Sequence, residues 1–197
     1  CVLGIIEDPV SIENIEKNIV ERAFKEGWIK PQPPKERTNK TIAVIGSGPS
    51  GLAAAQQLNR AGHLVTVFER DDAVGGLLRY GIPNFKMEKG IIDRRVAILE
   101  AEGILFKTNI NVGVNYDVAA LKGFDAIVLC GGSTEKRSLP TPGIDADGVV
   151  QAMDFLTQQT KVLFGKEVKD QIMATDKDVI VIGGGDTGSD CIGTSNR

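Results

Sequence analysis

The pattern of apolar and polar positions predicts a parallel β-sheet whose strands are joined by helices. Residues 41–45 and 64–69 are short apolar or β-branched runs, which are typical of buried strands. Similar runs predict further strands, the last two of them buried, at residues 104–108, 125–130 and 178–182. Helices are expected after the first strand up to residue 60, and over residues 11–24, 87–102 and 150–163. Strands that alternate with helices indicate an α/β fold.

Three glycines follow the first predicted strand at the spacing G-x-G-x-x-G, namely Gly46, Gly48 and Gly51. The first would let the chain turn sharply, the second would leave room for a pyrophosphate, and the third would let the next helix approach the sheet. The N-terminus of that helix would offer free N–H groups and about half a positive charge to a diphosphate. This first glycine loop, residues 46–51, predicts a bound dinucleotide. The alternative is a strand, turn and helix that bind no ligand.

An acidic residue, Glu69, ends the second predicted strand. Gly62 lies where the helix between the first and second predicted strands should end. An acid about twenty residues beyond such a glycine loop accepts hydrogen bonds from the two ribose hydroxyls of an adenosine. The carboxylate would repel a 2′-phosphate. We therefore expect the first site to hold FAD or NAD, and not NADP.

A second glycine loop, residues 183–188, repeats the spacing with Gly183, Gly185 and Gly188. It also follows a predicted strand and precedes a predicted helix. Adjacent glycines at residues 75–76 and 131–132 suggest backbone that passes close to a ligand, although a plain turn is the alternative for the first pair. Two glycine loops imply two nucleotides, and a protein that binds two usually transfers electrons between them.

The composition is that of an ordinary globular protein. The 197 residues are 42% hydrophobic and 25% charged, with a net charge of −3. The sequence has neither a basic surface suited to nucleic acid nor an apolar run of membrane-spanning length, so we expect no nucleic-acid and no membrane partner. The three cysteines lack disulfide or C-x-x-C spacing and no signal peptide is visible, which predicts a cytoplasmic protein.

The two ends of the chain suggest a piece of a longer protein, because it opens on Cys1 instead of Met and stops within a predicted helix. Ser11 is the expected N-cap of the first helix, and a proline-rich linker follows that helix. This N-terminal part either braces an upstream module or is a solvated extension. We expect four parts: a helical segment and linker at 1–37, a first nucleotide domain at 38–136, a linker and helix at 137–176, and the start of a second nucleotide domain at 177–197.

Four stretches resemble the family of small (beta) subunits of NADPH-dependent glutamate synthase, namely residues 42–55, 58–70, 74–83 and 183–197. The similarity covers the whole chain, and dihydropyrimidine dehydrogenase shares this module. The resemblance implies a Rossmann-like FAD-binding domain followed by the start of a Rossmann-like NADPH-binding domain. It also implies that a short helical segment at the N-terminus ends an iron–sulfur domain, in which Cys1 would be one thiolate ligand of a four-iron–four-sulfur cluster.

The resemblance further implies contacts of individual residues with the cofactors. Contacts with FAD are expected at Gly46, Ser47, Gly48, Pro49, Ser50, Gly51, Glu69, Arg70, Gly76, Leu77, Lys86, Val112, Gly131 and Gly132. Among these, Glu69 would bind the ribose, Lys86 would line the flavin, and the backbone of Val112 would touch the adenine. Contacts with the nicotinamide dinucleotide are expected at Gly183, Gly185, Asp186 and Thr187. Asp186 is alternatively a helix N-cap.

The activity that the resemblance implies is electron transfer from NADPH through FAD to iron–sulfur clusters. A large subunit would use the electrons to make glutamate from glutamine and 2-oxoglutarate. Because such a protein places two rings in contact, no side chain is expected to act as a catalytic acid or base. We expect this chain alone to be inactive. Two questions stay open from the sequence: whether the chain alone retains FAD, and whether the electron donor is NADPH or NADH. The alternatives are an NAD(P)H–ferredoxin-type or dihydropyrimidine-dehydrogenase-like oxidoreductase module, and a non-catalytic nucleotide-binding assembly module.

Overall fold

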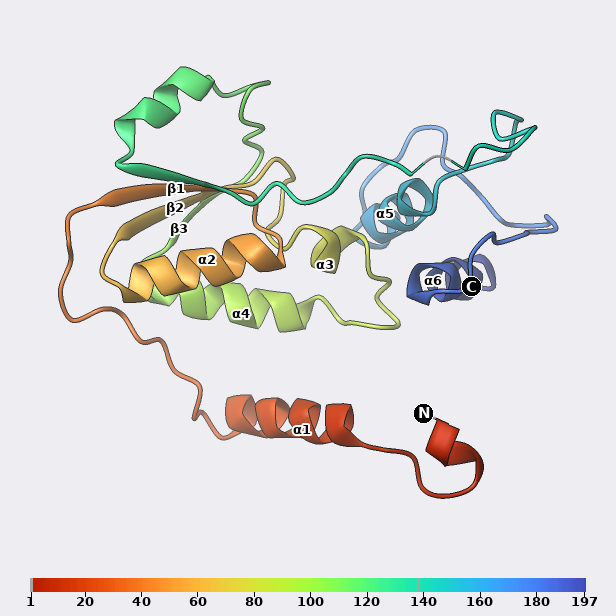
Figure 1. The fold of residues 1–197 in the computed structure, drawn as a ribbon, viewed down its shortest axis with the longest axis horizontal. Coiled ribbons are helices and arrows are strands. Elements are labelled where there is room, and N and C mark those ends of the chain that lie inside the picture. The colour runs from red at the N-terminus through yellow and green to blue at the C-terminus, as the bar shows by residue number, and fades with distance from the viewer. Residues whose placement is uncertain (1, 138) are drawn as a thin grey trace. The chain divides into compact units, whose positions relative to one another are not determined.

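The computed structural model describes residues 2–137 and 139–197, and the chain divides into two compact units between Gln32 and Pro33. The first unit contains a short 3-10 helix and one α-helix: η1, Val2–Ile5, and α1, Ile12–Lys25 (Figure 1). The helix expected at residues 11–24 is therefore confirmed, although the Ser11 side chain makes no capping hydrogen bond. Cys1, the expected cluster ligand, lies outside the described residues.

The second unit is built on a four-stranded parallel sheet, which confirms the predicted fold class. Its strands are β1, Thr41–Ile45; β2, Leu64–Phe68; β3, Leu105–Lys107; and β4, Ala126–Leu129. The order across the sheet is β3-β2-β1-β4, so β1 lies between β2 and β4. In the register, Ile45 lies opposite both Phe68 and Leu129. The carboxyl ends of these three strands therefore meet at one edge of the sheet.

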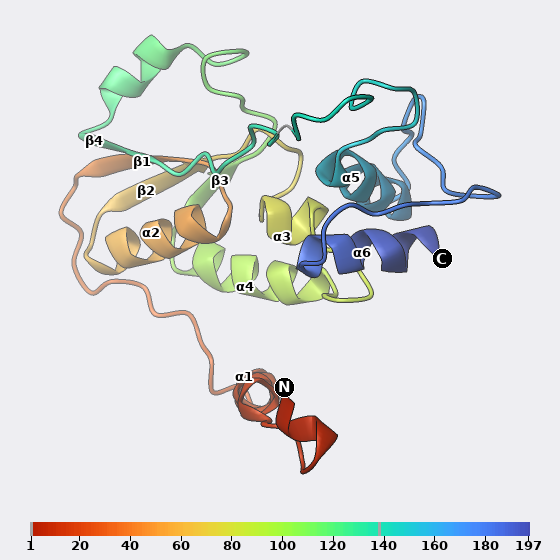
Figure 2. The same cartoon turned by 45° about the vertical axis from the view of Figure 1, so that its right-hand side comes forward.

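Two helices cover one face of the sheet and bury most of the core (Figures 1 and 2). They are α2, Pro49–Arg60, and α4, Gly90–Ala101. The largest cluster of buried apolar side chains includes Ile42, Val44, Leu52, Ala55, Val65, Val67 and Leu99. On the other face Phe68 packs against Tyr116 and Phe124, with ring centroids 5.1 and 5.8 Å apart. Burial of one side-chain set on each face fixes the register of the strands, because a slip of one residue would exchange the two faces.

Of the remaining helices, two lie between sheet strands in the chain and two follow the last strand. They are α3, Leu77–Tyr80; the 3-10 helix η2, Val118–Gly123; α5, Ala152–Leu163; and α6, Asp186–Ser195. The contact between α5 and α6 buries Phe155, Leu156 and Cys191. The helix expected at residues 150–163 is thus confirmed, whereas the one expected at 87–102 begins only at Gly90. In the described part of the chain, none of the helices has the length and apolar character needed to cross a membrane.

Two segments that were expected to be buried strands are not buried. β4 is an edge strand, and its Ile127 and Leu129 are 45% and 80% exposed. Residues 178–182 form no strand at all, and Ile180 is 89% exposed. The predictions of burial were wrong because an apolar run only shows what a segment is able to bury. Actual burial needs neighbouring strands or helices, and among the described residues none covers these side chains.

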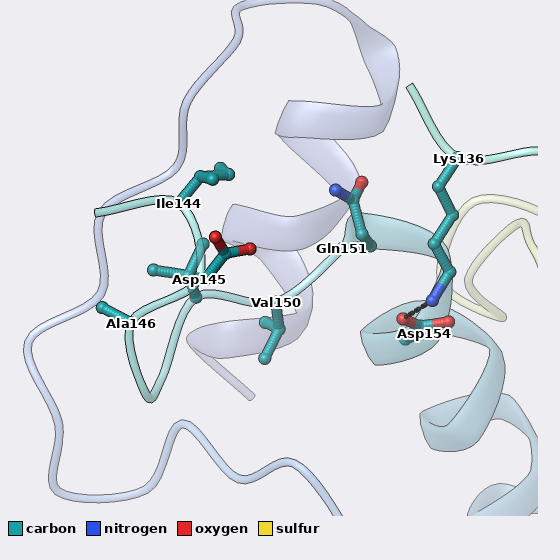
Figure 3. Close-up of a pocket in the computed structure, with 8 residues that line it drawn as sticks. Lys136, Ile144, Asp145, Ala146, Val150, Gln151 and Asp154 are labelled. Atoms are coloured by element: carbon teal, nitrogen blue, oxygen red, sulfur yellow. Dashed lines mark hydrogen bonds and ion pairs between the residues drawn. The ribbon is translucent and has the colours of Figure 1, made fainter. Parts of the chain in front are cut away.

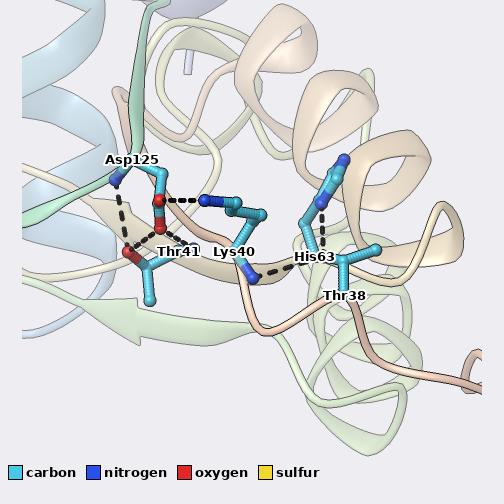
Figure 4. Close-up of polar contacts among 5 residues, drawn as sticks. All are labelled: Thr38, Lys40, Thr41, His63 and Asp125. Atoms are coloured by element: carbon cyan, nitrogen blue, oxygen red, sulfur yellow. Dashed lines mark hydrogen bonds and ion pairs between the residues drawn. The ribbon is translucent and has the colours of Figure 1, made fainter.

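A carboxylate anchors the amino-terminal ends of β1 and β4 (Figure 4). Asp125 accepts hydrogen bonds from the Thr41 N–H (2.8 Å), the Thr41 hydroxyl (3.0 Å) and Lys40 Nζ (2.9 Å). The Thr41 N–H, followed by the Lys40 side chain, lowers the pKa of Asp125 to about 2. Beside them, His63 Nδ1 lies 2.8 Å from the Thr38 hydroxyl. These contacts lie at the end of the strands opposite the first glycine loop, so they support the fold and not the candidate site.

Candidate functional site

The first glycine loop leaves the sheet at the carboxyl end of β1, between β2 and β4. Gly46 has a φ of 105°, a conformation that residues with a side chain rarely adopt. Its N–H donates a hydrogen bond of 2.8 Å to the Phe68 carbonyl. A Cβ on Gly46 would lie 2.8 Å from the carbonyl carbon of Cys130. Only glycine fits here, which confirms the sharp turn that the sequence predicted.

The other two glycines of this loop provide close packing and open space. A Cβ on Gly51 would lie 2.9 Å from the carbonyl carbon of Gly46, so α2 packs directly on the turn. A Cβ on Gly48 would meet no atom within 4 Å. Gly48 is the N-cap of α2, and its carbonyl accepts the N–H of Leu52 at 3.0 Å. The earlier N–H groups of Ser50 and Gly51 have no intrahelical acceptor, and beside the open space at Gly48 they form a cradle that fits a pyrophosphate.

The carboxylate at the end of β2 holds the first glycine loop in place. Ser47 is fully buried, and its main-chain N–H donates a hydrogen bond of 3.0 Å to Glu69 Oε2. The Ser47 hydroxyl donates to the same oxygen, and the N–H of Asp71 donates to Oε1 at 2.8 Å. Glu69 is only 5% exposed. The structure thus assigns Glu69 a contact with the loop in addition to the ribose contact, which stays a prediction.

The glycine pair at residues 75–76 closes against the first glycine loop. The Gly75 N–H donates to the Ser47 hydroxyl at 3.0 Å, and both glycines have positive φ, 130° and 54°. A Cβ on Gly76 would lie 3.0 Å from Gly48 Cα. The pair is therefore more than a surface turn, because its backbone forms one wall of the space beside Gly48. Leu77, at the start of α3, is 51% exposed, and Arg70 is exposed as well.

The second glycine loop has the same local geometry as the first, although no paired strand precedes it. Gly183 has a φ of 121°, where Gly46 has 105°. A Cβ on Gly188 would lie 3.3 Å from the carbonyl carbon of Gly183, which repeats the approach of Gly51 to Gly46. Gly185, the N-cap of α6, has an extended ψ of −175° and open space where a side chain would be. A turn, an open cradle and a close helix contact therefore occur twice in this chain.

Lys86 is the one expected FAD contact that the structure joins to the second glycine loop. Its Nζ lies 2.6 Å from Asp190 Oδ1 and 3.8 Å from Asp186 Oδ1, both on α6. The hydrogen bond to Asp190 raises the pKa of Lys86. Asp186 is the first residue of α6 and not its N-cap, so the alternative role considered for it is wrong. Asp186 and Thr187, both within this loop, are exposed.

The other expected contacts follow β3 and β4. Val112 bridges to Tyr116 in the segment after β3 and packs in the cluster around Phe68. Gly131 and Gly132 follow β4 and have open space where side chains would be. These positions lie beyond the carboxyl ends of the strands, where an open α/β sheet binds its ligands. Among the described residues, no group of three or more metal-binding side chains comes together.

A shallow hollow of about 440 Å³ lies apart from all of these residues (Figure 3). It is lined by Lys136, Ile144, Asp145, Ala146, Val149, Val150, Gln151 and Asp154. Lys136 Nζ and Asp154 Oδ2 form an ion pair of 2.6 Å on its rim. None of the residues expected to bind a cofactor takes part in it, so the candidate site is defined by the glycine loops.

Two buried cations next to the glycine pair were missed by the sequence analysis. Arg79 is 8% exposed and Lys89 is 5% exposed. Both donate hydrogen bonds to main-chain carbonyls of residues 74–82. The segment around Arg79 is too short for helical periodicity to show which side chains face inward. No signal in the sequence distinguishes these two residues from the exposed lysines and arginines around them.

The parallel sheet and the glycine turn at the carboxyl end of its central strand define a dinucleotide-binding protein. Residues 40–197 match the family described as pyridine nucleotide-disulphide oxidoreductase, and the chain belongs to this family. Its sequence is 55% identical, over 203 residues, to the glutamate synthase [NADPH] small chain of Mycobacterium tuberculosis. It is also 55% identical, over 202 residues, to glutamate synthase [NADH] of Schizosaccharomyces pombe. The resemblance drawn from the sequence motifs is therefore confirmed.

These similarities cover all of this chain but only part of each relative. The alignments span 100% of the chain, 42% of the M. tuberculosis protein and 10% of the S. pombe protein. Among solved structures, FprA of M. tuberculosis in complex with NADPH superposes with a TM-score of 0.55 at 30% identity. That similarity covers 60% of this chain and 28% of FprA. The chain thus shares its fold with an oxidoreductase and its sequence with part of the glutamate synthases.

Proposed function

We propose that this chain supplies the FAD site and part of the NADPH site of a glutamate synthase small chain. The observation that carries the proposal is the repeated geometry of the two glycine loops, each with a positive-φ glycine, an open N-cap glycine and a glycine packed on the turn. Two dinucleotide cradles in one chain suit a protein that moves electrons between two nucleotides. The similarity to the M. tuberculosis small chain supports the same role.

In this proposal the first glycine loop holds the pyrophosphate of FAD. The N–H groups of Ser50 and Gly51 would donate to it, and the absent side chain at Gly48 leaves the space that it needs. Glu69 would accept hydrogen bonds from the adenosine ribose while it keeps its contact with Ser47. A 2′-phosphate beside this buried carboxylate would be repelled, so FAD suits this loop better than NADPH does.

The second glycine loop, with Asp186 and Thr187, would bind NADPH. The bound NADPH of the structurally similar FprA supports this assignment. The named relatives differ in the nucleotide, since the M. tuberculosis small chain is an NADPH protein and the S. pombe enzyme an NADH protein. We favour NADPH because the small-chain relatives of M. tuberculosis and Bacillus subtilis, 55% and 54% identical to this chain, are both named for NADPH.

The chemistry that a bound FAD supplies is to accept a hydride and to release electrons one at a time. The residues of this chain bind and orient: the two cradles fix the phosphates, and residues 75–77 form a wall beside the first cradle. No side chain is needed as an acid or base for this chemistry. We further propose that Cys1 is one ligand of a four-iron–four-sulfur cluster. A large subunit would then use the electrons to form glutamate from glutamine and 2-oxoglutarate.

The proposal is tested by purifying the complete gene product with FAD and measuring retained flavin after gel filtration. We expect bound flavin, and tighter binding of NADPH than of NADH in a titration of the loaded protein. Co-purification with a glutamate synthase large subunit would support the finer assignment. A protein that folds but retains no flavin would contradict the proposal and favour an assembly module without cofactor.

A further inference from the structure

α3 directly follows the glycine pair that closes against the first glycine loop, and it is too short to be stable by itself. It comprises only four residues, Leu77–Tyr80. Isolated helices shorter than about twelve residues are marginal in water. The last carbonyls of such a helix have no partner within the helix and need donors from elsewhere. What holds α3 therefore also decides how firmly Gly76 is held against Gly48.

Lys89 provides those donors from the start of α4. Its Nζ donates a hydrogen bond of 3.0 Å to the Leu78 carbonyl and a second one to the Ile82 carbonyl. The residue is 5% exposed, so the ammonium group is held inside the protein. This position does not favour a cation for the sake of α4, because Lys89 is its N-cap and the N-terminus of a helix carries partial positive charge. The contacts with the Leu78 carbonyl in α3 and the Ile82 carbonyl just after it compensate for this placement.

Arg79, within α3, ties this helix to the chain on its N-terminal side. Its Nε donates to the Val74 carbonyl at 2.8 Å, one residue before the glycine pair. Its guanidinium also forms an ion pair of 2.6 Å with Asp93, whose side chain is 62% exposed. Burial, followed by the charge of Arg79, lowers the pKa of Lys89 to about 8. The solvated carboxylate of Asp93 pairs with Arg79, whereas the buried charge of Lys89 is met by main-chain carbonyls, an arrangement that costs stability unless these hydrogen bonds are made.

The chain of contacts from Lys89 to the candidate FAD site is continuous. Lys89 fixes the Leu78 and Ile82 carbonyls, and the N–H groups of residues 78–82 bond back to the Gly75, Gly76 and Leu77 carbonyls at 2.8–3.1 Å. Gly76 in turn lies against Gly48. On the basis of the FAD function proposed above, we propose that Lys89 is a positioning residue. It holds α3, and with it the glycine wall of the FAD cradle, through main-chain carbonyls.

The experiment compares the complete gene products of wild type, Lys89→Met, Lys89→Arg and the control Lys122→Met, which removes an exposed lysine. Methionine preserves the length and the apolar stem but donates no hydrogen bond. Amide hydrogen exchange of residues 78–82 and of β1 is measured without FAD, and FAD affinity is measured by equilibrium dialysis. In Lys89→Met we expect faster exchange in residues 78–82, unchanged exchange in β1, and about tenfold weaker FAD binding, as for a partial transmission to the cradle of the two lost charge-assisted hydrogen bonds.

Lys89→Arg should be closer to wild type than Lys89→Met is, and Lys122→Met should match wild type. Wild-type exchange in residues 78–82 of Lys89→Met would overturn the proposal, as would unchanged FAD affinity. Equal acceleration in β1 and α3 would also overturn it, because Lys89 would then support the whole fold and not this segment. A wild-type protein that binds no FAD contradicts the proposed function instead, and the exchange rates still decide whether Lys89 holds α3.

Discussion

Glu69 Oε2 accepts a hydrogen bond of 3.0 Å from the main-chain N–H of Ser47, and this bond joins the end of β2 to the loop that follows β1. The same oxygen accepts the Ser47 hydroxyl, which in turn accepts the Gly75 N–H at 3.0 Å. One carboxylate therefore organises both glycine segments of the first cradle. An acid at this position has a structural task before any cofactor is bound.

Replacing Glu69 should lower stability as well as FAD retention. Glu69→Ala leaves the buried N–H and hydroxyl of Ser47 without their acceptor, which costs on the order of 1–3 kcal/mol of unfolding free energy. Urea denaturation without FAD measures this cost, and flavin content after gel filtration measures retention. Glu69→Gln, which keeps one acceptor oxygen, should lose less stability. Unchanged stability and unchanged flavin content in Glu69→Ala would contradict both roles of the carboxylate.

Gly51, the last glycine of the cradle, should respond to substitution differently from Gly48. Gly48→Val places its side chain in open space at a φ of −65°, so the protein should fold normally and lose FAD binding. Gly51→Val would force atoms into the Gly46 carbonyl and should destabilise the fold by about 1–3 kcal/mol or more. Thermal unfolding and FAD binding of the two variants separate these effects. Full flavin loading of Gly48→Val would show that the space beside Gly48 is not the pyrophosphate site.

The Asp125 anchor predicts a loss of stability in acid. Its pKa is lowered to about 2 in the folded protein from 3.8, chiefly by the Thr41 N–H. The stabilisation is therefore complete above the unfolded pKa and is lost as the pH falls toward the folded pKa. We expect wild type to exceed Asp125→Asn in urea resistance at about pH 6, with the difference shrinking between about pH 4 and pH 3. A difference that stays constant over this range would contradict the assigned contacts.

Lys89 predicts a pH dependence of the same sign as Asp125, but in base. Its folded pKa is lowered to about 8 from 10.5, so the folded protein binds fewer protons than the unfolded chain between these values. Stability should therefore rise with pH in this window, relative to Lys89→Met, which cannot titrate there. Urea midpoints of both proteins, measured from about pH 7.5 to pH 10, test the sign. Parallel curves for the two proteins would mean that Lys89 titrates normally.

Local patterns in the sequence were sufficient to predict the central elements. β1, β2 and the first glycine loop each depend on a few adjacent residues, and the positive φ of Gly46 follows from the tight turn that the motif requires. The glycines of the second loop were predictable for the same reason. The acid at Glu69 was predictable from its distance along the chain, although its bonds to Ser47 were not.

Features that depend on distant neighbours could not be predicted in this way. The exposure of Leu129 and Ile180 depends on which other elements pack against them. The sequence of an apolar run does not specify those elements. The burial of Lys89 arises because the chain folds back after α3, so that the carbonyls of Leu78 and Ile82 accept its hydrogen bonds, and no helical or strand period relates these positions. The pairing of Lys86 with Asp190 joins segments about a hundred residues apart, and no spacing rule relates them.

The most direct test of the central claim is an anaerobic titration of the FAD-loaded complete gene product with NADPH. We expect the absorbance of oxidised flavin to be bleached in wild type. We expect no bleaching in Gly185→Val, whose side chain would fill the open N-cap of the second glycine loop while the FAD cradle stays intact. Wild-type protein that holds FAD but is not bleached, or Gly185→Val that is bleached as fast as wild type, would contradict electron transfer between these two loops.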